Sequence, residues 1–286
     1  MLVAVVGDKG MFGQDMVSLL RSQGENVASF NRSNLDLADS TVQIAEAISR
    51  ADVIVNAVAY TKVDAAEDHQ EEANLVNGEY AGKLALVAKN LGAKFIQIST
   101  DYVFSGASHT PFPVDASTVP ANAYGASKLL GEEMVSNSGS NYQIFRTAWL
   151  YGARGKCFPK SIAKQLLDSG VANVVSDQIG QPTWSKDLAE IVYSHIKNPQ
   201  NEQVVHAVSS GSTSWFEFAE AVASSLSRYG TFTIERISSR EISTRAHRPS
   251  YSVLDNSGTN GPIIGNWLDR WKVAAPEILS SIQKLE

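Results

Sequence analysis

The sequence has little cysteine, no long apolar run and no excess of positive charge. Cys157 is the only cysteine among 286 residues, which excludes an internal disulfide framework and fits a reducing compartment. The early apolar run from Leu2 to Val6 is too short to span a membrane, and it lacks the basic leader and cleavage site of a signal peptide. A net charge of −6 and a pI of about 5.4 argue against nucleic acid or acidic lipid as partners.

Histidine is also sparse, and its spacing carries no metal signal. The five histidines are scattered along the chain without the pairing of a metal site, so we expect no metal. The composition, with 43% hydrophobic and 19% charged residues, is ordinary for a globular protein that buries a large core. These observations predict a soluble cytoplasmic protein without nucleic-acid or membrane partners.

The first half of the chain alternates strand and helix signals. Short apolar runs predict strands, and apolar residues at helical spacing predict the helices between them. We expect strands over residues 2–6, 27–30, 53–55, 94–98 and 143–145, and helices over residues 14–23, 42–48, 71–91 and 124–135. Strands separated by single helices form right-handed βαβ units. Residues 1–150 are therefore predicted to form a Rossmann-type domain of the α/β class, with a doubly wound parallel sheet.

After about residue 150 the strand signals become sparse. We expect strands over residues 173–176, 204–208 and 232–237, and helices over residues 186–197 and 215–227. The polar, basic segment 238–252 reads as a long loop, and such loops are often functional. Residues 151–286 are predicted to form mainly a smaller C-terminal substrate-binding lobe, with some segments returning to the Rossmann domain.

A glycine-rich segment directly follows the first predicted strand. It reads Gly7-Asp8-Lys9-Gly10-Met11-Phe12-Gly13 and leads straight into a predicted helix. Glycines permit the tight turn and let a pyrophosphate approach the positive end of that helix. A tight turn without a ligand is the alternative, but the strand before it and the helix after it favour a dinucleotide site. The Rossmann domain over residues 1–150 is therefore predicted to bind NAD(P).

The end of the second predicted strand indicates which nicotinamide cofactor binds. A carboxylate there would hydrogen-bond the ribose diol and repel a 2′-phosphate. This chain has Asn31-Arg32-Ser33 instead, and Arg32 and Ser33 can both bind a phosphate. We therefore predict NADPH as the preferred cofactor, with NADH possible. The alternative is that Arg32 is only a solvated surface residue.

Tyr124 and Lys128 are spaced i, i+4 and so share a helix face. A free phenol is a poor acid at neutral pH, and a neighbouring ammonium is expected to lower its pKa. Thr100 follows a predicted strand, at the sheet edge where ligands bind, and can polarise a carbonyl. An ordinary surface pair is the alternative, but the preceding dinucleotide fold favours a proton-transfer site.

The ordered motifs of the chain resemble the short-chain dehydrogenase/reductase superfamily in its extended form. Within it the chain is similar to the dTDP-4-dehydrorhamnose reductases. The similarity includes Ser99-Thr100-Asp101-Tyr102-Val103-Phe104 and Tyr124-Gly-Ala-Ser-Lys128. The other matching segments are 7–13, 56–67, 131–132, 146–151, 177–183 and 248–252. One departure is that Met11-Phe12 replace a Gln-Leu or Gln-Val pair common in these reductases.

The resemblance implies a set of site residues. Thr100, Tyr124 and Lys128 would be catalytic. The residues that would bind the cofactor are Gly7, Gly10, Met11, Phe12, Gly13, Asn31, Arg32, Ser33, Asp36, Leu37, Ala57, Ala59, Tyr60, Tyr124 and Lys128. Those that would bind the nucleotide sugar are Thr100, Asp101, Tyr102, Tyr124, Trp149, Arg248 and Ser252. The expected reaction is NADPH-dependent reduction of the C4 ketone of a nucleotide-linked 4-keto-6-deoxysugar, dTDP-4-dehydro-L-rhamnose above all.

Two other functions stay open at this point. The enzyme could reduce another nucleotide 4-keto-hexose, since the sequence does not fix the product stereochemistry. Some relatives are instead non-catalytic, NADP-binding regulatory subunits of methionine adenosyltransferase. Dehydration is disfavoured, because dehydratases of the superfamily carry an acidic residue where this chain has Tyr102. A homodimer is a possible assembly.

Overall fold

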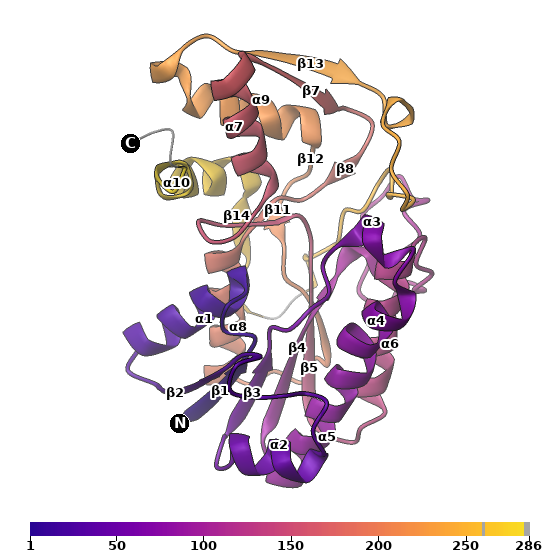
Figure 1. Cartoon of the computed structure of the whole chain (residues 1–286), viewed down its shortest axis with the longest axis vertical. Coiled ribbons are helices and arrows are strands. Elements are labelled where there is room, and N and C mark those ends of the chain that lie inside the picture. The colour runs from indigo at the N-terminus through magenta and orange to yellow at the C-terminus, as the bar shows by residue number, and fades with distance from the viewer. Residues whose placement is uncertain (259–260, 283–286) are drawn as a thin grey trace.

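A parallel sheet forms the lower part of the molecule in Figure 1. The computed structural model describes residues 1–258 and 261–282. The sheet strands, in spatial order, are β10 (Val204–His206), β5 (Asn141–Thr147), β4 (Lys94–Thr100), β3 (Val53–Asn56), β1 (Leu2–Val6) and β2 (Asn26–Phe30). From β1 the chain runs to β2 on one side and then to β3 on the other. The carboxyl ends of β1 and β3 therefore form the switch point at which such sheets bind ligands.

Helices cover both faces of this sheet, and the strand residues alternate between them. Val3 and Val5 pack against α1 (Met11–Ser22) and α8 (Ser185–Lys197). Ala4 and Val6 pack on the opposite face, against helices whose buried residues include Ile44, Leu84 and Val135. Those helices are α2 (Thr41–Ile48), α5 (Tyr80–Leu91) and α6 (Ala123–Ser136). The predicted doubly wound α/β fold is confirmed.

The predicted helix over residues 71–91 is interrupted. It consists of α4 (Gln70–Asn74), a π-helical turn (Leu75–Glu79) and α5. The wider turn directs the Asn77 side chain inward, where its amide bonds the backbone of Tyr60 and the hydroxyl of Ser127. Nothing in the local sequence predicts this turn, because the partners of Asn77 are 17 and 50 residues away.

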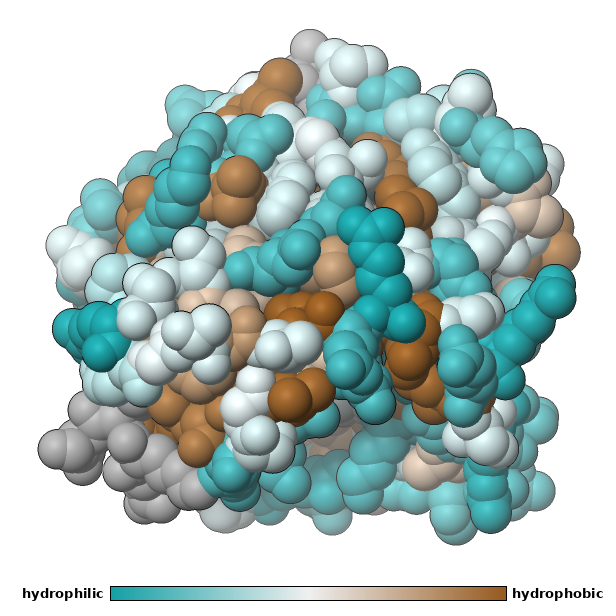
Figure 2. All heavy atoms as spheres, turned by 90° about the horizontal axis from the view of Figure 1, so that it is seen from above, coloured by the Kyte–Doolittle hydropathy of each residue, from teal (hydrophilic) through white to brown (hydrophobic). Residues whose placement is uncertain are grey.

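A smaller lobe lies above the sheet in Figure 1. Its core joins Tyr151 and Phe218 to Trp271, around α7 (Phe158–Ser169), α9 (Trp215–Ser225) and α10 (Trp267–Ser280). The paired strands are β7 (Val171–Val175) with β13 (Thr233–Ile237), β8 (Ile179–Gly180) with β12 (Thr213–Ser214), β6 (Leu150–Tyr151) with β9 (Thr183–Trp184), and β11 (Ser209–Ser210) with β14 (Ile264–Asn266). Seen from this end in Figure 2, apolar side chains form small patches between hydrophilic ones.

Several parts of the second half differ from the expectation. Helices α7 and α10 were not predicted, whereas α8, α9, β7 and β13 fall at or within a few residues of their predicted places. Strand β10 pairs with β5 in the large sheet, and α8 packs on α1, so both belong to the Rossmann layers. The predicted loop 238–252 is irregular apart from a 3₁₀ turn at Ser239–Glu241 and an isolated β-bridge between Tyr251 and Ile179. The remaining short helices are α3 (Val63–Ala66) and 3₁₀ turns at Asp101–Val103 and Ser227–Tyr229.

None of the helices in residues 1–258 and 261–282 is both long and apolar enough to cross a membrane.

Candidate active site

A cavity of about 670 Å³ opens at the carboxyl ends of β1, β3, β4 and β5, beneath the smaller lobe. It brings together residues that the sequence places in six separate motifs. The predicted site residues that line it are Gly10, Met11, Phe12, Ala57, Ala59, Thr100, Asp101, Tyr102, Tyr124, Lys128, Trp149 and Arg248. Cofactor-type and substrate-type residues therefore share one continuous space, as transfer between two bound molecules requires.

The glycine loop has the geometry of a phosphate cradle. Gly7 has a φ of 98°, which disfavours any residue with a side chain. A Cβ on Gly13 would lie 2.2 Å from the Gly7 carbonyl oxygen, so only glycine lets α1 start this close to the loop. No side chain of the described residues caps the start of α1, whose first residues face the cavity. The uncapped N–H groups and the positive end of the helix dipole fit a dinucleotide pyrophosphate.

The residues predicted to hold the adenosine half lie around the end of β2, outside the lining of the cavity. Asn31 donates to Asp8 Oδ1 at 3.0 Å and accepts from the backbone N–H and hydroxyl of Ser33. Arg32 and Asp36 are exposed, whereas Leu37 is buried in the core. Their cofactor contacts stay predictions, as does that of Tyr60, which packs in an apolar cluster.

Thr100, Tyr124 and Lys128 meet in the cavity, as predicted from their spacing and strand position. The prediction for the phenol pKa is wrong in direction. Burial raises the pKa of Tyr124 above its ordinary value, the charge of Asp101 adds to this, and a hydrogen bond with Thr100 opposes it only in part. The Lys128 ammonium donates to the Ile98 carbonyl oxygen at 2.6 Å. Spacing alone could not reveal how strongly the surrounding segments desolvate the phenol.

Two other buried groups in the cavity have shifted pKa values. Burial lowers the pKa of Lys128 to about 8, and the charge of Glu132 opposes this shift. Burial raises the pKa of Asp101 to about 6, against hydrogen bonds from the hydroxyls of Ser252 and Thr100. Clusters of desolvated titratable groups are typical of catalytic sites. Ser252 does not line the cavity itself, but this contact places it directly behind Asp101.

Helix α6 holds the candidate catalytic residues Tyr124 and Lys128 against the end of β4. A Cβ on Gly125 would lie 2.2 Å from the Tyr102 carbonyl oxygen, so glycine allows the close approach. Asn122 caps the helix by accepting from the Gly125 N–H, and its amide donates to the His247 carbonyl oxygen. The same residue therefore ties the start of α6 to the loop 238–252 that carries Arg248.

Arg248 reaches the cavity from this loop. Its Nη2 lies 2.8 Å from Asp64 Oδ2 in an ion pair, and it also bonds Tyr102. Asp64 additionally accepts the Ala246 N–H at 3.2 Å, which fixes the loop against α3. A guanidinium has five N–H donors, so Arg248 keeps donors for a diphosphate while bound to Asp64.

Some cavity residues were missed by the sequence analysis. Lys9 and Lys156 bring positive charge to its lining, and Phe158 and Trp215 bring aromatic rings from α7 and α9. Lys9 stands inside the glycine motif and could have been proposed from its position. The two aromatic residues reach the cavity only by packing of the smaller lobe, for which the local sequence holds no signal. In the described part of the chain, no three His, Cys, Asp or Glu residues gather as a metal site would need.

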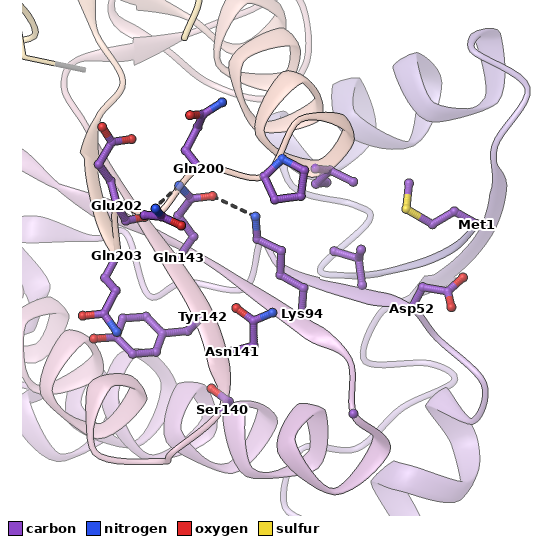
Figure 3. A pocket seen from close by; sticks show the side chains of 15 residues that line it. Met1, Asp52, Lys94, Ser140, Asn141, Tyr142, Gln143, Gln200, Glu202 and Gln203 are labelled. Carbon is purple, nitrogen blue, oxygen red and sulfur yellow. Dashed lines mark hydrogen bonds between the residues drawn. The ribbon is translucent and has the colours of Figure 1, made fainter. Parts of the chain in front are cut away.

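A second cavity, of about 460 Å³, lies at the opposite edge of the sheet (Figure 3). Lys94 and Gln143 line it, and the Lys94 ammonium donates to Gln143 Oε1 at 3.1 Å and to the His195 carbonyl oxygen at 3.1 Å. None of the predicted site residues lies there. Open α/β sheets bind ligands at the carboxyl ends of their strands, so the larger cavity is the candidate active site.

Comparison with known proteins agrees with this geometry. The RmlD substrate binding domain family matches residues 1–284. A dTDP-4-dehydrorhamnose reductase from Burkholderia thailandensis is 36% identical over 90% of this chain and 91% of its own. A probable dTDP-4,6-dihydroxy-2-methyloxan-3-one 4-ketoreductase from Streptomyces antibioticus is 34% identical over 97% of this chain and 95% of its own.

A solved structure has the same fold throughout. The dTDP-4-dehydrorhamnose reductase of Bacillus anthracis, in complex with NADP, superposes with a TM-score of 0.90 at 30% identity, covering 96% of this chain and 99% of that one. The family assignment rests on two findings. A curated relative is more than 30% identical over nine-tenths of both chains, and the family matches nearly the whole sequence. The chain belongs to the dTDP-4-dehydrorhamnose reductase family.

Proposed function

We propose that this protein reduces the C4 ketone of a nucleotide-linked 4-keto-6-deoxysugar with NADPH, and that the sugar is dTDP-4-dehydro-L-rhamnose. One observation carries the proposal. A partly buried phenol, Tyr124, with a raised pKa, lies in one cavity with Thr100, Lys128 and the glycine loop of a dinucleotide site. A phenol that stays protonated at neutral pH is a proton donor, which is what reduction of a ketone needs.

The proposed mechanism assigns one role to each catalytic side chain. NADPH, when bound, supplies the hydride to the carbonyl carbon. The Tyr124 hydroxyl donates its proton to the carbonyl oxygen as negative charge develops there. Thr100 now donates to Asp101 Oδ1 at 2.9 Å, and its hydroxyl would turn to the same carbonyl oxygen. The Lys128 ammonium stabilises the phenolate that remains on Tyr124.

The other groups hold the two molecules. The start of α1, with Lys9, would bind the cofactor pyrophosphate, and Arg248 with Lys156 would bind the sugar-nucleotide diphosphate. Asp101, Tyr102 and Trp149 would contact the sugar.

The single cysteine supports a cytoplasmic location. The homodimer stays a prediction.

The direct test supplies enzymatically generated dTDP-4-dehydro-L-rhamnose and follows the oxidation of NADPH. The proposal expects rapid oxidation, with a product whose C4 configuration NMR identifies as dTDP-L-rhamnose. Oxidation only with another 4-keto-hexose would move the assignment to that sugar. NADPH binding without turnover on any keto sugar would favour the non-catalytic subunit, and capture of methionine adenosyltransferase would then be sought.

Replacing Arg32 tests the predicted preference for NADPH. Arg32→Ala should raise the KM for NADPH about 10-fold and leave the KM for NADH unchanged, because only NADPH has a 2′-phosphate for the guanidinium. Arg21→Ala, at the end of α1, is the matched control. An unchanged NADPH/NADH ratio in the Arg32 variant would assign Arg32 to the solvated surface.

The lowered pKa of Lys128 predicts an alkaline limit to activity. A lowered pKa means that the ammonium loses its proton as the pH rises through about 8, so kcat/KM should fall above that pH. Lys128→Arg should be less active but should keep a flat profile between pH 8 and about 10, since a guanidinium stays charged there. The same alkaline fall in both proteins would assign it to another group.

A further inference from the structure

Trp149 has an unusual backbone conformation for a large side chain. Its φ is 44°, in the left-handed region, at the turn between β5 and β6. Such a conformation costs free energy and persists where the surroundings fix it, often at functional sites. The contacts on both faces of the Trp149 indole identify what fixes this backbone conformation.

One face of the Trp149 indole lies against the backbone of Gly180 in β8. A Cβ on Gly180 would lie 2.3 Å from Cε2 and 2.6 Å from each of its bonded neighbours, Cζ2 and Nε1. Cε2 is nearest and its two neighbours are equally distant, which is the pattern of an approach from above the ring plane. Glycine is therefore required at position 180, and this face of the indole is closed.

The opposite face of the Trp149 indole is covered by Trp215. The two rings are 5° from parallel with centroids 3.4 Å apart, and the Phe158 ring contacts Trp215 at a tilt of 48° with centroids 4.5 Å apart. Trp215 is the first residue of α9, whose start is fixed by a capping box between Ser214 and Glu217. Gly180, Trp149 and Trp215 thus form one column, the aromatic column, that joins the sheet to the smaller lobe, and Phe158 packs against its Trp215 end.

Because Gly180 and Trp215 cover both faces of the Trp149 indole, only the edge of the ring can contact a ligand in the cavity. An aromatic face is negative and attracts sugar C–H groups, whereas an aromatic edge is positive and attracts oxygens. Trp149, Trp215 and Phe158 all line the cavity with Tyr124. We propose that Trp215 is a positioning residue that clamps Trp149 against Gly180, so that the Trp149 edge selects among 4-keto sugars by the placement of their oxygens.

The inference rests on the proposed function for its kinetic part. dTDP-4-dehydro-L-rhamnose and dTDP-4-dehydro-6-deoxy-D-glucose differ in configuration at C3 and C5, so their oxygens meet a fixed edge differently. Releasing Trp149 by Trp215→Leu should raise the KM for the preferred sugar about 10-fold, with an unchanged KM for NADPH. The ratio of kcat/KM between the two sugars should fall by a similar factor.

A spectroscopic measurement tests the column without any turnover. Two stacked indoles couple their electronic transitions and give a pair of circular dichroism bands of opposite sign. The pair should be present in the native protein, absent in Trp215→Leu and Trp215→Phe, and retained in Trp267→Phe, whose ring lies 5.9 Å from Phe218 outside the column. The pair of bands should also persist when dTDP saturates the NADP-bound protein, because Trp149 and Trp215 are expected to stay stacked when the nucleotide binds.

Either of two results would overturn the proposal. The coupled bands could vanish when dTDP or the keto sugar binds, which would mean that the stack opens and Trp149 offers its face. Alternatively Trp215→Leu, which removes the stacking ring, could lose the coupled bands and yet keep the native KM and the native sugar selectivity. If the native protein reduces neither sugar, the proposed function has failed, and the bands with and without dTDP still decide whether the stack is fixed.

Discussion

Tyr124→Phe should lower kcat about 10²- to 10⁴-fold, the usual contribution of a positioned general acid. The replacement removes only the hydroxyl, and the ring keeps its edge contact with Tyr102, with centroids 5.9 Å apart. Desolvation raises the pKa of the phenol, so at neutral pH it is protonated and holds the proton that the carbonyl oxygen needs. NADPH oxidation with dTDP-4-dehydro-L-rhamnose measures kcat, and fluorescence titration measures NADPH binding, which should change little.

Tyr142→Phe is the matched control for this variant. Tyr142 stands at the amino end of β5, beside the second cavity in Figure 3, and so at the edge of the sheet away from the reaction. The same loss of one hydroxyl should leave kcat within about 2-fold, as for surface changes away from a site. Near-normal turnover of the Tyr124 variant would mean that another group supplies the proton.

The sheet and the grouping of the candidate catalytic residues were predictable because their signals are local. A strand buried on both faces has to be a continuous apolar run, as Leu2–Val6 is, and the glycines after it meet a local steric need. Tyr124 and Lys128 lie on one helix turn, so their proximity follows from spacing. The direction of the pKa shift of the Tyr124 phenol does not follow from spacing, because it depends on burial by distant segments.

The smaller lobe was harder to predict because packing overrides its local signals. Pro276 lies inside α10, where proline normally interrupts a helix, yet Trp271, Ala275 and Ile278 bury that helix in the lobe core. The same packing brings Trp215 to the cavity, 66 residues along the chain from its partner Trp149. No local pattern contains that information.

The buried ion pair between Arg146 and Glu132 links this fold to the site. Arg146 on β5 donates from Nη2 to Glu132 Oε2 at 2.7 Å and from Nε to Oε1 at 3.0 Å. Ser99, the residue before Thr100, donates to Glu132 Oε1 at 2.5 Å. Both charged side chains are only 7% exposed. The pair therefore fastens the catalytic helix α6 to the strands that carry Thr100 and the cavity floor.

Breaking this pair from one side should be the most destabilising single change considered. Arg146→Met leaves the Glu132 carboxylate buried without its cation and should lower the free energy of unfolding by about 3–5 kcal/mol. A domain has about 5–15 kcal/mol in total, so denaturant unfolding will resolve the loss. Glu277→Gln breaks an exposed pair with Lys186, in which the side chains are 41% and 44% exposed, and should cost less than about 1 kcal/mol.

The double variant Arg146→Met with Glu132→Leu separates the loss of a partner from the loss of the pair. Two apolar residues leave no buried charge, so stability should return to within about 1–2 kcal/mol of the native protein. Activity should respond differently, because the charge of Glu132 raises the pKa of Lys128. Without that charge the alkaline fall in kcat/KM should move below pH 8 even where stability recovers. If the double variant were as unstable as Arg146→Met, desolvation of the two charges would not be the main cost of the pair. If it kept the native pH profile, the charge of Glu132 would not act on the pKa of Lys128.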